Sequence, residues 1–298
     1  MQGQLIFTAS MTKSAITPHQ LASSLNEDIR LVVLDIDGTI AGKSNEVTQE
    51  VINALEAVKA QGIKVTLATG RMYCSALYFA QAIGTDLPII CYNGAWIQTP
   101  ETADRVWHLP VPIHLATELL DYCEQPEWRS LLDVHFYLND QLYVREITEE
   151  TRYYIERSRI QANAVGDLRY LLDQGPTKVL AMSSNPEVTN HLISEIKQRY
   201  SDNQLYLTQS NPYFFEACHP GASKGKALRY LVEEQLHLKP ENTIAIGDNF
   251  NDIEMLNYAT LGIAMGDAPA EVQAQADWVA PNVEADGVVT ALNKFLLS

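Results

Sequence analysis

Residues 31–39 read LVVLDIDGT. The run from Leu31 to Ile36 is nearly all apolar and ends at Gly38, a pattern typical of a strand buried on both faces of a parallel sheet. Asp35 and Asp37 stand at the carboxyl end of this predicted strand, where open parallel sheets bind their ligands. Two carboxylates this close repel each other unless a cation or a proton intervenes, so the pair predicts a Mg²⁺ site or a shifted pKa. An ordinary turn would also use Asp and Gly here.

Downstream of this strand, helix-like and strand-like segments alternate. Residues 48–61 have helical periodicity, with Thr48 as the expected N-cap and Gly62 just beyond the C-terminus. The segments that follow are a β-rich run (63–68), a helix (72–83) and a third short strand (88–91). This alternation of three strands with two helices predicts βαβ units and a parallel sheet.

The middle of the chain has a different pattern. Residues 135–138 and 141–145 alternate in polarity around Asn139-Asp140, which predicts an antiparallel hairpin. A helix with steps of four over 188–200 lies between two further strand-like segments. Mixed hairpins and helices predict an α+β insert, and after residue 223 the βα rhythm returns.

The expected fold class is therefore α/β, a Rossmann-like parallel-sheet core with an inserted α+β domain. We expect an N-terminal extension (1–29), a core in two pieces (30–107 and 213–298) and an insert (108–212).

Composition excludes several classes of partner. With 21 Lys and Arg against 37 Asp and Glu, the net charge is −16, whereas a sequence-independent nucleic-acid binder needs a cationic face. A small anionic substrate stays possible, because a metal and a few cations can reverse the field locally. We expect no secretory signal and no membrane span, and a monomer or small homo-oligomer. Four widely separated cysteines favour reduced thiols in the cytoplasm: Cys74, Cys91, Cys123 and Cys218.

Three further motifs follow predicted strands or begin predicted helices. In residues 68–71 (ATGR), the Thr69 hydroxyl and free amides at a helix start suit a phosphate. In residues 223–226 (SKGK), Lys224 would add a point charge at another helix start. Residues 247–252 (GDNFND) cluster the hard oxygen ligands that Mg²⁺ prefers. Taken alone, each motif could have an ordinary structural role, as a turn, a solvated lysine or a helix cap. The occurrence of all four in order is much less probable by chance.

Together the four motifs resemble those of the haloacid dehalogenase superfamily of Mg²⁺-dependent phosphohydrolases. The arrangement is most similar to the Cof-like branch, in which an α+β cap is inserted between the second and third motifs. The long gap between Thr69 and Lys224 leaves room for such a cap. Two segments that flank it also resemble Cof-like sequences, PIICYNGA (88–95) and FEACHPGASKG (215–225). The resemblance covers about residues 31–298.

The resemblance implies a role for each acidic motif residue. Asp35 would be the nucleophile that forms an aspartyl-phosphate, and Asp37 would protonate the leaving alkoxide and then deprotonate water. Mg²⁺ would be held by the Asp35 carboxylate, the Asp37 backbone carbonyl and Asp248. Asp252 would orient a metal-bound water.

The resemblance also implies which residues contact the phosphate or the substrate: Thr69, Gly70, Arg71, Asn93, Lys224 and Asn251. Thr69 and Lys224 would act in catalysis by holding phosphoryl oxygens in the transition state. Arg71 and Asn93 either face the substrate or fix the hinge between core and cap.

The implied function is a Mg²⁺-dependent phosphatase of small phosphorylated metabolites, with sugar phosphates as the default class. One alternative is a phosphotransferase or mutase of the phosphomannomutase kind, and another is a binding module that has lost catalysis. Outside the motifs, we expect a half-exposed helix face formed by Arg152, Tyr153, Tyr154 and Arg157.

Overall fold

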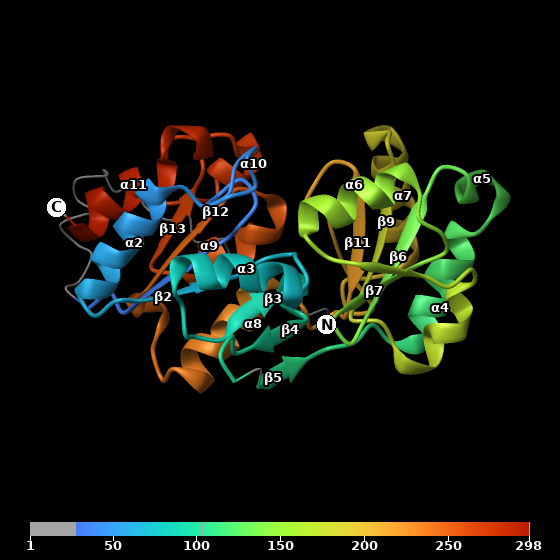
Figure 1. Cartoon of the computed structure of the whole chain (residues 1–298), viewed down its shortest axis with the longest axis horizontal. Helices are drawn as coiled ribbons and strands as arrows, with labels where there is room; N and C mark the ends of the chain where they lie inside the picture. Colours follow the sequence, from blue (N-terminus) through green and yellow to red (C-terminus); the bar gives the residue numbers. More distant parts are fainter. Residues whose placement is uncertain (1–27, 103, 298) are drawn as a thin grey trace, which may run out of the picture.

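The computed structural model describes residues 28–102 and 104–297, which form two lobes (Figure 1). The extension predicted for residues 1–29 lies almost entirely outside this range. The strands are β1 (Leu31–Leu34), β2 (Lys64–Leu67), β3 (Ile89–Cys91), β4 (Trp96–Gln98), β5 (Arg105–His108), β6 (Asp133–Leu138), β7 (Gln141–Val144), β8 (Ala162–Ala164), β9 (Lys178–Met182), β10 (Tyr206–Thr208), β11 (Phe214–Cys218), β12 (Thr243–Gly247), β13 (Leu261–Ala264) and β14 (Trp278–Val279). The α-helices are α2 (Gln49–Ala60), α3 (Tyr73–Ile83), α4 (Ile113–Cys123), α5 (Pro126–Arg129), α6 (Glu149–Ser158), α7 (Pro186–Arg199), α8 (Lys224–Tyr230), α9 (Ile253–Tyr258), α10 (Ala270–Gln273) and α11 (Gly287–Leu292).

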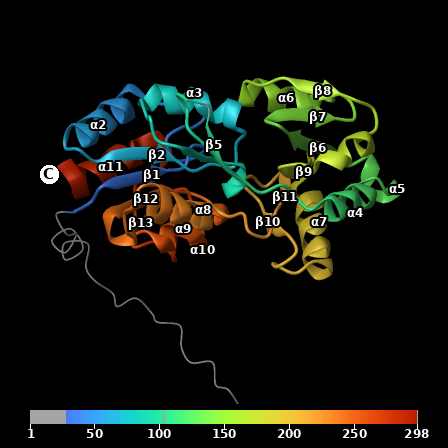
Figure 2. The same cartoon turned by 90° about the horizontal axis from the view of Figure 1, so that it is seen from below.

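The core lobe is built on a five-stranded parallel sheet in the order β14-β13-β12-β1-β2. Helices α2 and α3 lie above this sheet and α8, α9 and α10 below it (Figure 2). The side chains of β1 alternate between the two layers: Val32 and Leu34 join the α2–α3 cluster, and Leu31 and Val33 join the α8–α9 cluster. The prediction of a central strand buried on both faces is confirmed, and so is the α/β fold class.

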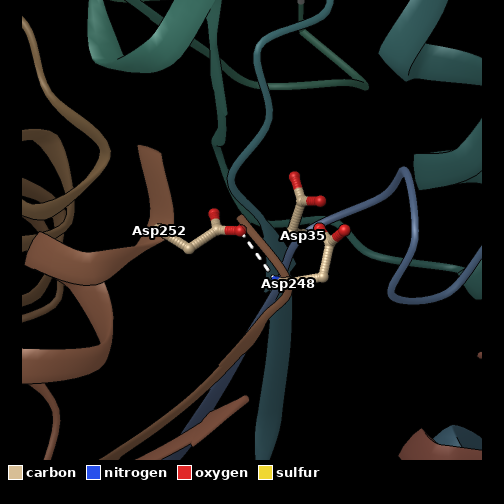
Figure 3. A group of neighbouring side chains, drawn as sticks. All are labelled: Asp35, Asp248 and Asp252. Carbon is tan, nitrogen blue, oxygen red and sulfur yellow. Dashed lines mark hydrogen bonds between the residues drawn. The ribbon is translucent and has the colours of Figure 1, made fainter. Parts of the chain in front are cut away.

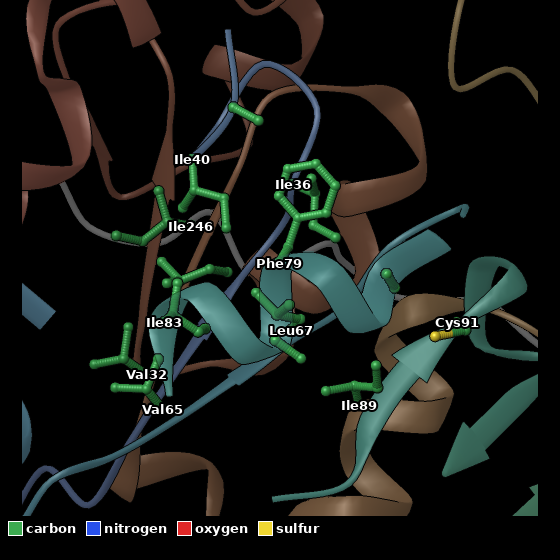
Figure 4. Close-up of a cluster of buried hydrophobic side chains, with 14 of the residues drawn as sticks. Val32, Ile36, Ile40, Val65, Leu67, Phe79, Ile83, Ile89, Cys91 and Ile246 are labelled. Atoms are coloured by element: carbon green, nitrogen blue, oxygen red, sulfur yellow. The ribbon is translucent and has the colours of Figure 1, made fainter. Parts of the chain in front are cut away.

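A continuous apolar cluster joins β1 and β2 to the helix that follows the second strand. Figure 4 shows Val32, Val65 and Leu67 packed beneath Phe79 and Ile83 of α3. Because α3 starts directly after residues 69–71, this packing fixes the loop that was predicted to bind phosphate.

The inserted lobe contains a six-stranded sheet in the order β10-β11-β9-β6-β7-β8. Helices α4 and α7 contribute to the cluster on one of its faces, while residues of the other face join the core cluster together with Tyr154 of α6. The hairpin predicted at Asn139-Asp140 joins β6 to β7, with φ of 49° and 60° at the two turn residues, as a type I′ turn requires. We call this lobe the cap.

Two predicted details are wrong. The return to the core was expected at residue 213, but β11 pairs with cap strands β9 and β10, so the cap sheet continues to Cys218. The third strand was expected in the parallel sheet, but β3 makes only one parallel bridge there, from Ile90 to Ala68 just beyond β2, and its ladder partner is the antiparallel β4. The reason is a sharp reversal at Tyr92 and Asn93, both with positive φ, which sends the chain back as a ribbon between the lobes.

All four cysteines are free thiols, and only Cys74 is exposed. Among the described residues, none of the helices is both long and apolar enough to cross a bilayer.

Candidate active site

Three carboxylates from two neighbouring strand ends meet at the carboxyl edge of the core sheet. Asp35 follows β1, while Asp248 and Asp252 follow β12, the strand that pairs with β1 (Figure 3). One oxygen of each lies within 4.8 Å of the others. Gly38 makes this approach possible, because a Cβ at that residue would lie 2.2 Å from Oδ2 of Asp248, and its φ of +80° also favours glycine.

Lys224 is the cation of this cluster. It begins α8, is fully buried, and donates from Nζ to Asp35 Oδ1 and Asp252 Oδ1, both at 2.6 Å. Although burial alone would lower the pKa of Lys224, the charges of Asp252 and Asp35 raise it above its usual value. One ammonium therefore faces three carboxylates, and the cluster carries an excess of negative charge.

Burial, together with the excess negative charge, shifts two of the carboxyl groups toward their protonated forms. Burial raises the pKa of Asp35 to about 7 against the opposing charge of Lys224. Burial and the charge of Asp35 raise the pKa of Asp248 to about 9. A divalent cation between these oxygens would replace the missing positive charge, which is the reason the residues fit Mg²⁺.

Asp252 differs from the other two carboxylates because its oxygens are already engaged. Oδ1 accepts from Lys224, and Oδ2 accepts from the backbone amides of Asp248 and Asn249 at 2.9 and 3.0 Å. Asp252 thus holds the loop that carries Asp248, which leaves Asp35 and Asp248 as the carboxylates with oxygens available to a metal.

The metal-free protein should lose stability as the pH rises. Asp35 and Asp248 have raised pKa values in the folded chain, so between pH 7 and pH 9 the folded state binds more protons than the unfolded state. The free energy of unfolding should therefore fall by about 3 kcal/mol over this interval. Urea unfolding in EDTA measures it. Asp248→Asn should remove most of the fall, and an unchanged slope in that variant would contradict the assignment.

Asp37 faces the cavity with its side chain 43% exposed, and Arg71 holds both of its oxygens. Arg71 donates from Nε to Oδ2 at 2.7 Å and from Nη2 to Oδ1 at 2.6 Å, and a third bond reaches Asn45 Oδ1. Burial opposes ionisation of Asp37, but these hydrogen bonds and the charge of Arg71 outweigh it and lower its pKa. For Arg71 the sequence left substrate contact and a hinge role open; in the structure its guanidinium is engaged with Asp37.

The phosphate loop predicted from Thr69 and Gly70 lies beside Asp35 and Asp37 along the same cavity. The Thr69 hydroxyl accepts from the amide of Arg71 at 3.1 Å, which closes the loop. The Gly70 carbonyl accepts from Lys178 Nζ at 2.9 Å. Lys178 belongs to β9 of the cap, so a cap residue fixes the orientation of the core loop.

Asn93 lies behind this loop and is fully buried. Its backbone N–H donates to the carbonyl of Thr69. In its side chain, Oδ1 accepts from Asn251 Nδ2 at 2.9 Å, and Nδ2 donates to Glu216 Oε1. Asn93 thus links the phosphate loop to Asn251 and to the cap residue Glu216. Asn251 lines the cavity, and its buried Oδ1 has no hydrogen-bond partner among the described residues.

Glu216 and Lys178, on the neighbouring cap strands β11 and β9, form a buried ion pair at 2.6 Å. The pair faces the core, where Lys178 reaches Gly70 and Glu216 accepts from Asn93. Sequence reasoning did not identify either residue as part of the site. The signal for Glu216 was present, because it lies within the flanking segment 215–225, but a lysine within a cap strand has no local pattern that reveals its partner.

The core motifs and the cap enclose a cavity of about 1050 Å³. From the core, Asp35, Asp37, Thr69, Gly70, Arg71 and Asp248 line it. From the cap, residues of α6, β9 and the segment before β11 line it. The cavity is large enough for a small phosphorylated molecule. The carboxylates that line it lie beneath the cap.

A cap residue that was not predicted also completes helix α3. The N-cap residue of α3, Met72, provides no side-chain hydrogen bond. Instead the carboxylate of Asp140, from the hairpin turn of the cap, accepts from the amides of Tyr73 and Cys74 at 2.9 and 2.8 Å. A negative group at this end also interacts favourably with the helix dipole.

Asp140→Gly should therefore destabilise the protein by about 1–2 kcal/mol, since it removes the cap without straining the positive φ of the turn. Urea unfolding measures the change. Asn139→Gly is the matched control, in the same turn and with no capping bond, and should be nearly neutral. Equal effects of the two substitutions would show that Asp140 stabilises only the turn.

The chain matches the sequence profile of the haloacid dehalogenase-like hydrolases over residues 32–292. Among curated relatives, the 5-amino-6-(5-phospho-D-ribitylamino)uracil phosphatase YitU of Bacillus subtilis is 26% identical, over 89% of this chain and 97% of its own. The pyridoxal phosphate phosphatase YbhA of Escherichia coli is 25% identical, over 90% and 99%. The solved structure of TM0651 from Thermotoga maritima is 28% identical with a TM-score of 0.74, over 89% and 97%.

The profile covers most of the chain, from β1 through α11, and thus includes all four motifs and the cap. The relatives cover both lobes as well, and those named above are phosphatases. The resemblance seen in the motifs is confirmed: the chain belongs to the haloacid dehalogenase-like hydrolases, in their Cof-like branch.

Proposed function

We propose that this protein is a Mg²⁺-dependent phosphatase that hydrolyses small phosphorylated metabolites through an aspartyl-phosphate. The observation that carries the proposal is the position of Asp35. Its carboxylate lies at the floor of the cavity, bonded to Lys224 and next to Asp248, with Thr69 and Gly70 along the same wall. The phosphatase names of the relatives support the reaction class.

Each residue has a distinct task in this proposal. Asp35 attacks phosphorus and takes the phosphoryl group, while the leaving alkoxide receives a proton from Asp37. Asp37 then removes a proton from the water that hydrolyses the acyl-phosphate. Asp35, Asp248 and the backbone carbonyl of Asp37 would hold Mg²⁺, which would offset the charge of the carboxylates and the phosphate.

Three neighbouring groups would bind the phosphoryl oxygens, namely the Thr69 hydroxyl, the Gly70 amide and the Lys224 ammonium. Charge on these oxygens is spread in the transition state, so fixed donors favour that state. Asn251 lines the same cavity and would contact phosphate or substrate. Arg71 must release Asp37, at least in part, for that carboxyl group to carry a proton.

Sugar phosphates are the proposed substrate class, as the family resemblance implies. The name of YitU, a phosphatase of a phosphorylated ribityl compound, is in keeping with this class. The four free thiols support a cytoplasmic setting as part of the proposal. Transfer to a second hydroxyl is the competing reaction, and a requirement for a bisphosphate activator would favour it.

Phosphate release across phosphorylated sugars, nucleotides and vitamins tests the proposal. We expect release from at least one class with Mg²⁺, loss of release in EDTA, and recovery when Mg²⁺ is restored. Release that is indifferent to both additions would refute the metal assignment, and absence of release from every compound would refute the reaction.

A further inference from the structure

One face of helix α6 lines the active-site cavity. The residues are Glu150, Tyr153, Tyr154 and Arg157, at the i, i+3, i+4 and i+7 spacing that places side chains on one side of a helix. The sequence suggested only a half-exposed helix face here. The structure shows that this face is part of the cavity wall.

Arg157 fixes the direction in which this wall extends. Its Nη2 lies 3.8 Å from Asp37 Oδ1, and its carbonyl accepts from Asn45 Nδ2 at 2.8 Å. The C-terminal end of α6 is therefore close to the reacting carboxylates. Tyr153 precedes Arg157 by four residues, which places it about 6 Å farther along the helix.

The cavity wall also presents uncovered aromatic rings. Tyr153 is 65% exposed, and Tyr213, in the segment before β11, is 46% exposed; both line the cavity. Tyr154 and Phe214 differ, because they pack edge to face on each other with ring centroids 5.8 Å apart. Tyr154 and Phe214 therefore support the wall. Tyr153 and Tyr213 offer aromatic surface with no partner ring among the described residues.

We propose that the alcohol released by this enzyme carries a flat aromatic ring, which stacks on Tyr153 and Tyr213. This inference rests on the proposed phosphatase activity and specifies its substrate class: a phosphate monoester in which a linker of several atoms joins the phosphate to the ring. Arg157 lies beside that linker. Ser183 and Asn211 also line the cavity and offer hydrogen bonds to linker hydroxyls, so a sugar or sugar-alcohol phosphate that bears a ring fits the same wall.

Two matched series of substrates test the ring directly. Phenylalkyl and cyclohexylalkyl phosphates with one to four methylenes have alkoxide leaving groups of similar basicity, and they differ in whether the ring is flat and aromatic. Because cyclohexyl is the more hydrophobic ring, burial alone cannot produce a preference for phenyl. We expect kcat/KM for the phenyl compound to exceed that of its cyclohexyl partner by about tenfold at the best linker length.

Tyr153→Leu and Tyr213→Leu should each reduce this ratio, and the double variant should bring it close to one. Tyr170→Leu is the matched control, because Tyr170 is an exposed tyrosine of the cap that does not line the cavity. It should leave the ratio unchanged.

Equal turnover of both series, or a phenyl preference that survives the double variant, would overturn the ring inference while leaving the phosphatase intact. If neither series nor any sugar phosphate released phosphate in Mg²⁺, the proposed function itself would fail, and this inference with it.

Discussion

Asp35→Asn is expected to lower Mg²⁺-dependent phosphate release by at least about 10⁴-fold. The amide is nearly the same size as the carboxylate, but it is a far weaker nucleophile and a poorer ligand for Mg²⁺. Since burial raises the pKa of Asp35 to about 7, the metal-free protein already holds this group partly uncharged near neutral pH. The variant should therefore fold, and circular dichroism with urea unfolding would verify it.

Asp267→Asn provides the control for this experiment. Asp267 lines the same cavity but is exposed and lies outside the carboxylate cluster. Its replacement should keep phosphate release within about twofold of the unmodified protein. Full turnover by a correctly folded Asp35→Asn variant would exclude Asp35 as the nucleophile.

Lys224→Met is expected to have the second largest effect, on both activity and stability. It keeps most of the length of the side chain but removes the cation that pairs with Asp35 and Asp252. Loss of one partner leaves buried charge uncompensated, which costs about 3 kcal/mol of the free energy of unfolding. Loss of a fixed donor to the phosphoryl group should lower kcat by about 10²–10³-fold.

Mg²⁺ should restore part of the lost stability in Lys224→Met but little of the activity, because it replaces the charge and not the ammonium donor. Lys226→Met is the matched control two residues away, since among the described residues the exposed Lys226 ammonium donates to the Pro220 carbonyl alone. Urea unfolding and steady-state turnover of both variants separate the two effects. Equal losses in both variants would contradict the role given to Lys224.

The core and its motifs could be predicted because their determinants are local. An apolar run followed by Asp35, and the Thr48 and Gly62 boundaries of α2, are short patterns whose structural outcome depends little on the rest of the chain. The carboxyl ends of parallel strands meet at one edge of the sheet, so the motif order alone brings Asp35 and Asp248 together.

The cap contacts could not be predicted because they depend on how two lobes meet. In the sequence, Asp140 has the features of a turn residue. Only the contact of the hairpin with the core shows that its carboxylate caps α3. Lys178 lies in an ordinary strand pattern, and its partners, Gly70 and Glu216, are far away in the chain. Arg71 is a case within the core: the sequence left substrate contact and a hinge role open, while the fold places Asp37 within reach of its guanidinium.

The strand β3 was misjudged for a different physical reason. Its short apolar sequence fits a parallel or an antiparallel neighbour equally well. The reversal at Tyr92 and Asn93 decides between them, and positive φ at a bulky residue such as Tyr92 is not readable from composition.

Phosphoryl transfer to Asp35 can be measured by acid quenching the protein during turnover and mapping its peptides by mass spectrometry. With an aryl phosphate as substrate, whose leaving group needs no proton from Asp37, the Asp37→Asn variant should retain more of the acyl-phosphate, because the residue that activates water is missing. We expect the added phosphoryl group on the peptide that contains Asp35, at higher occupancy in Asp37→Asn than in the unmodified protein. A phosphoryl group on any other residue, or turnover with no phosphorylated peptide in either protein, would contradict this mechanism.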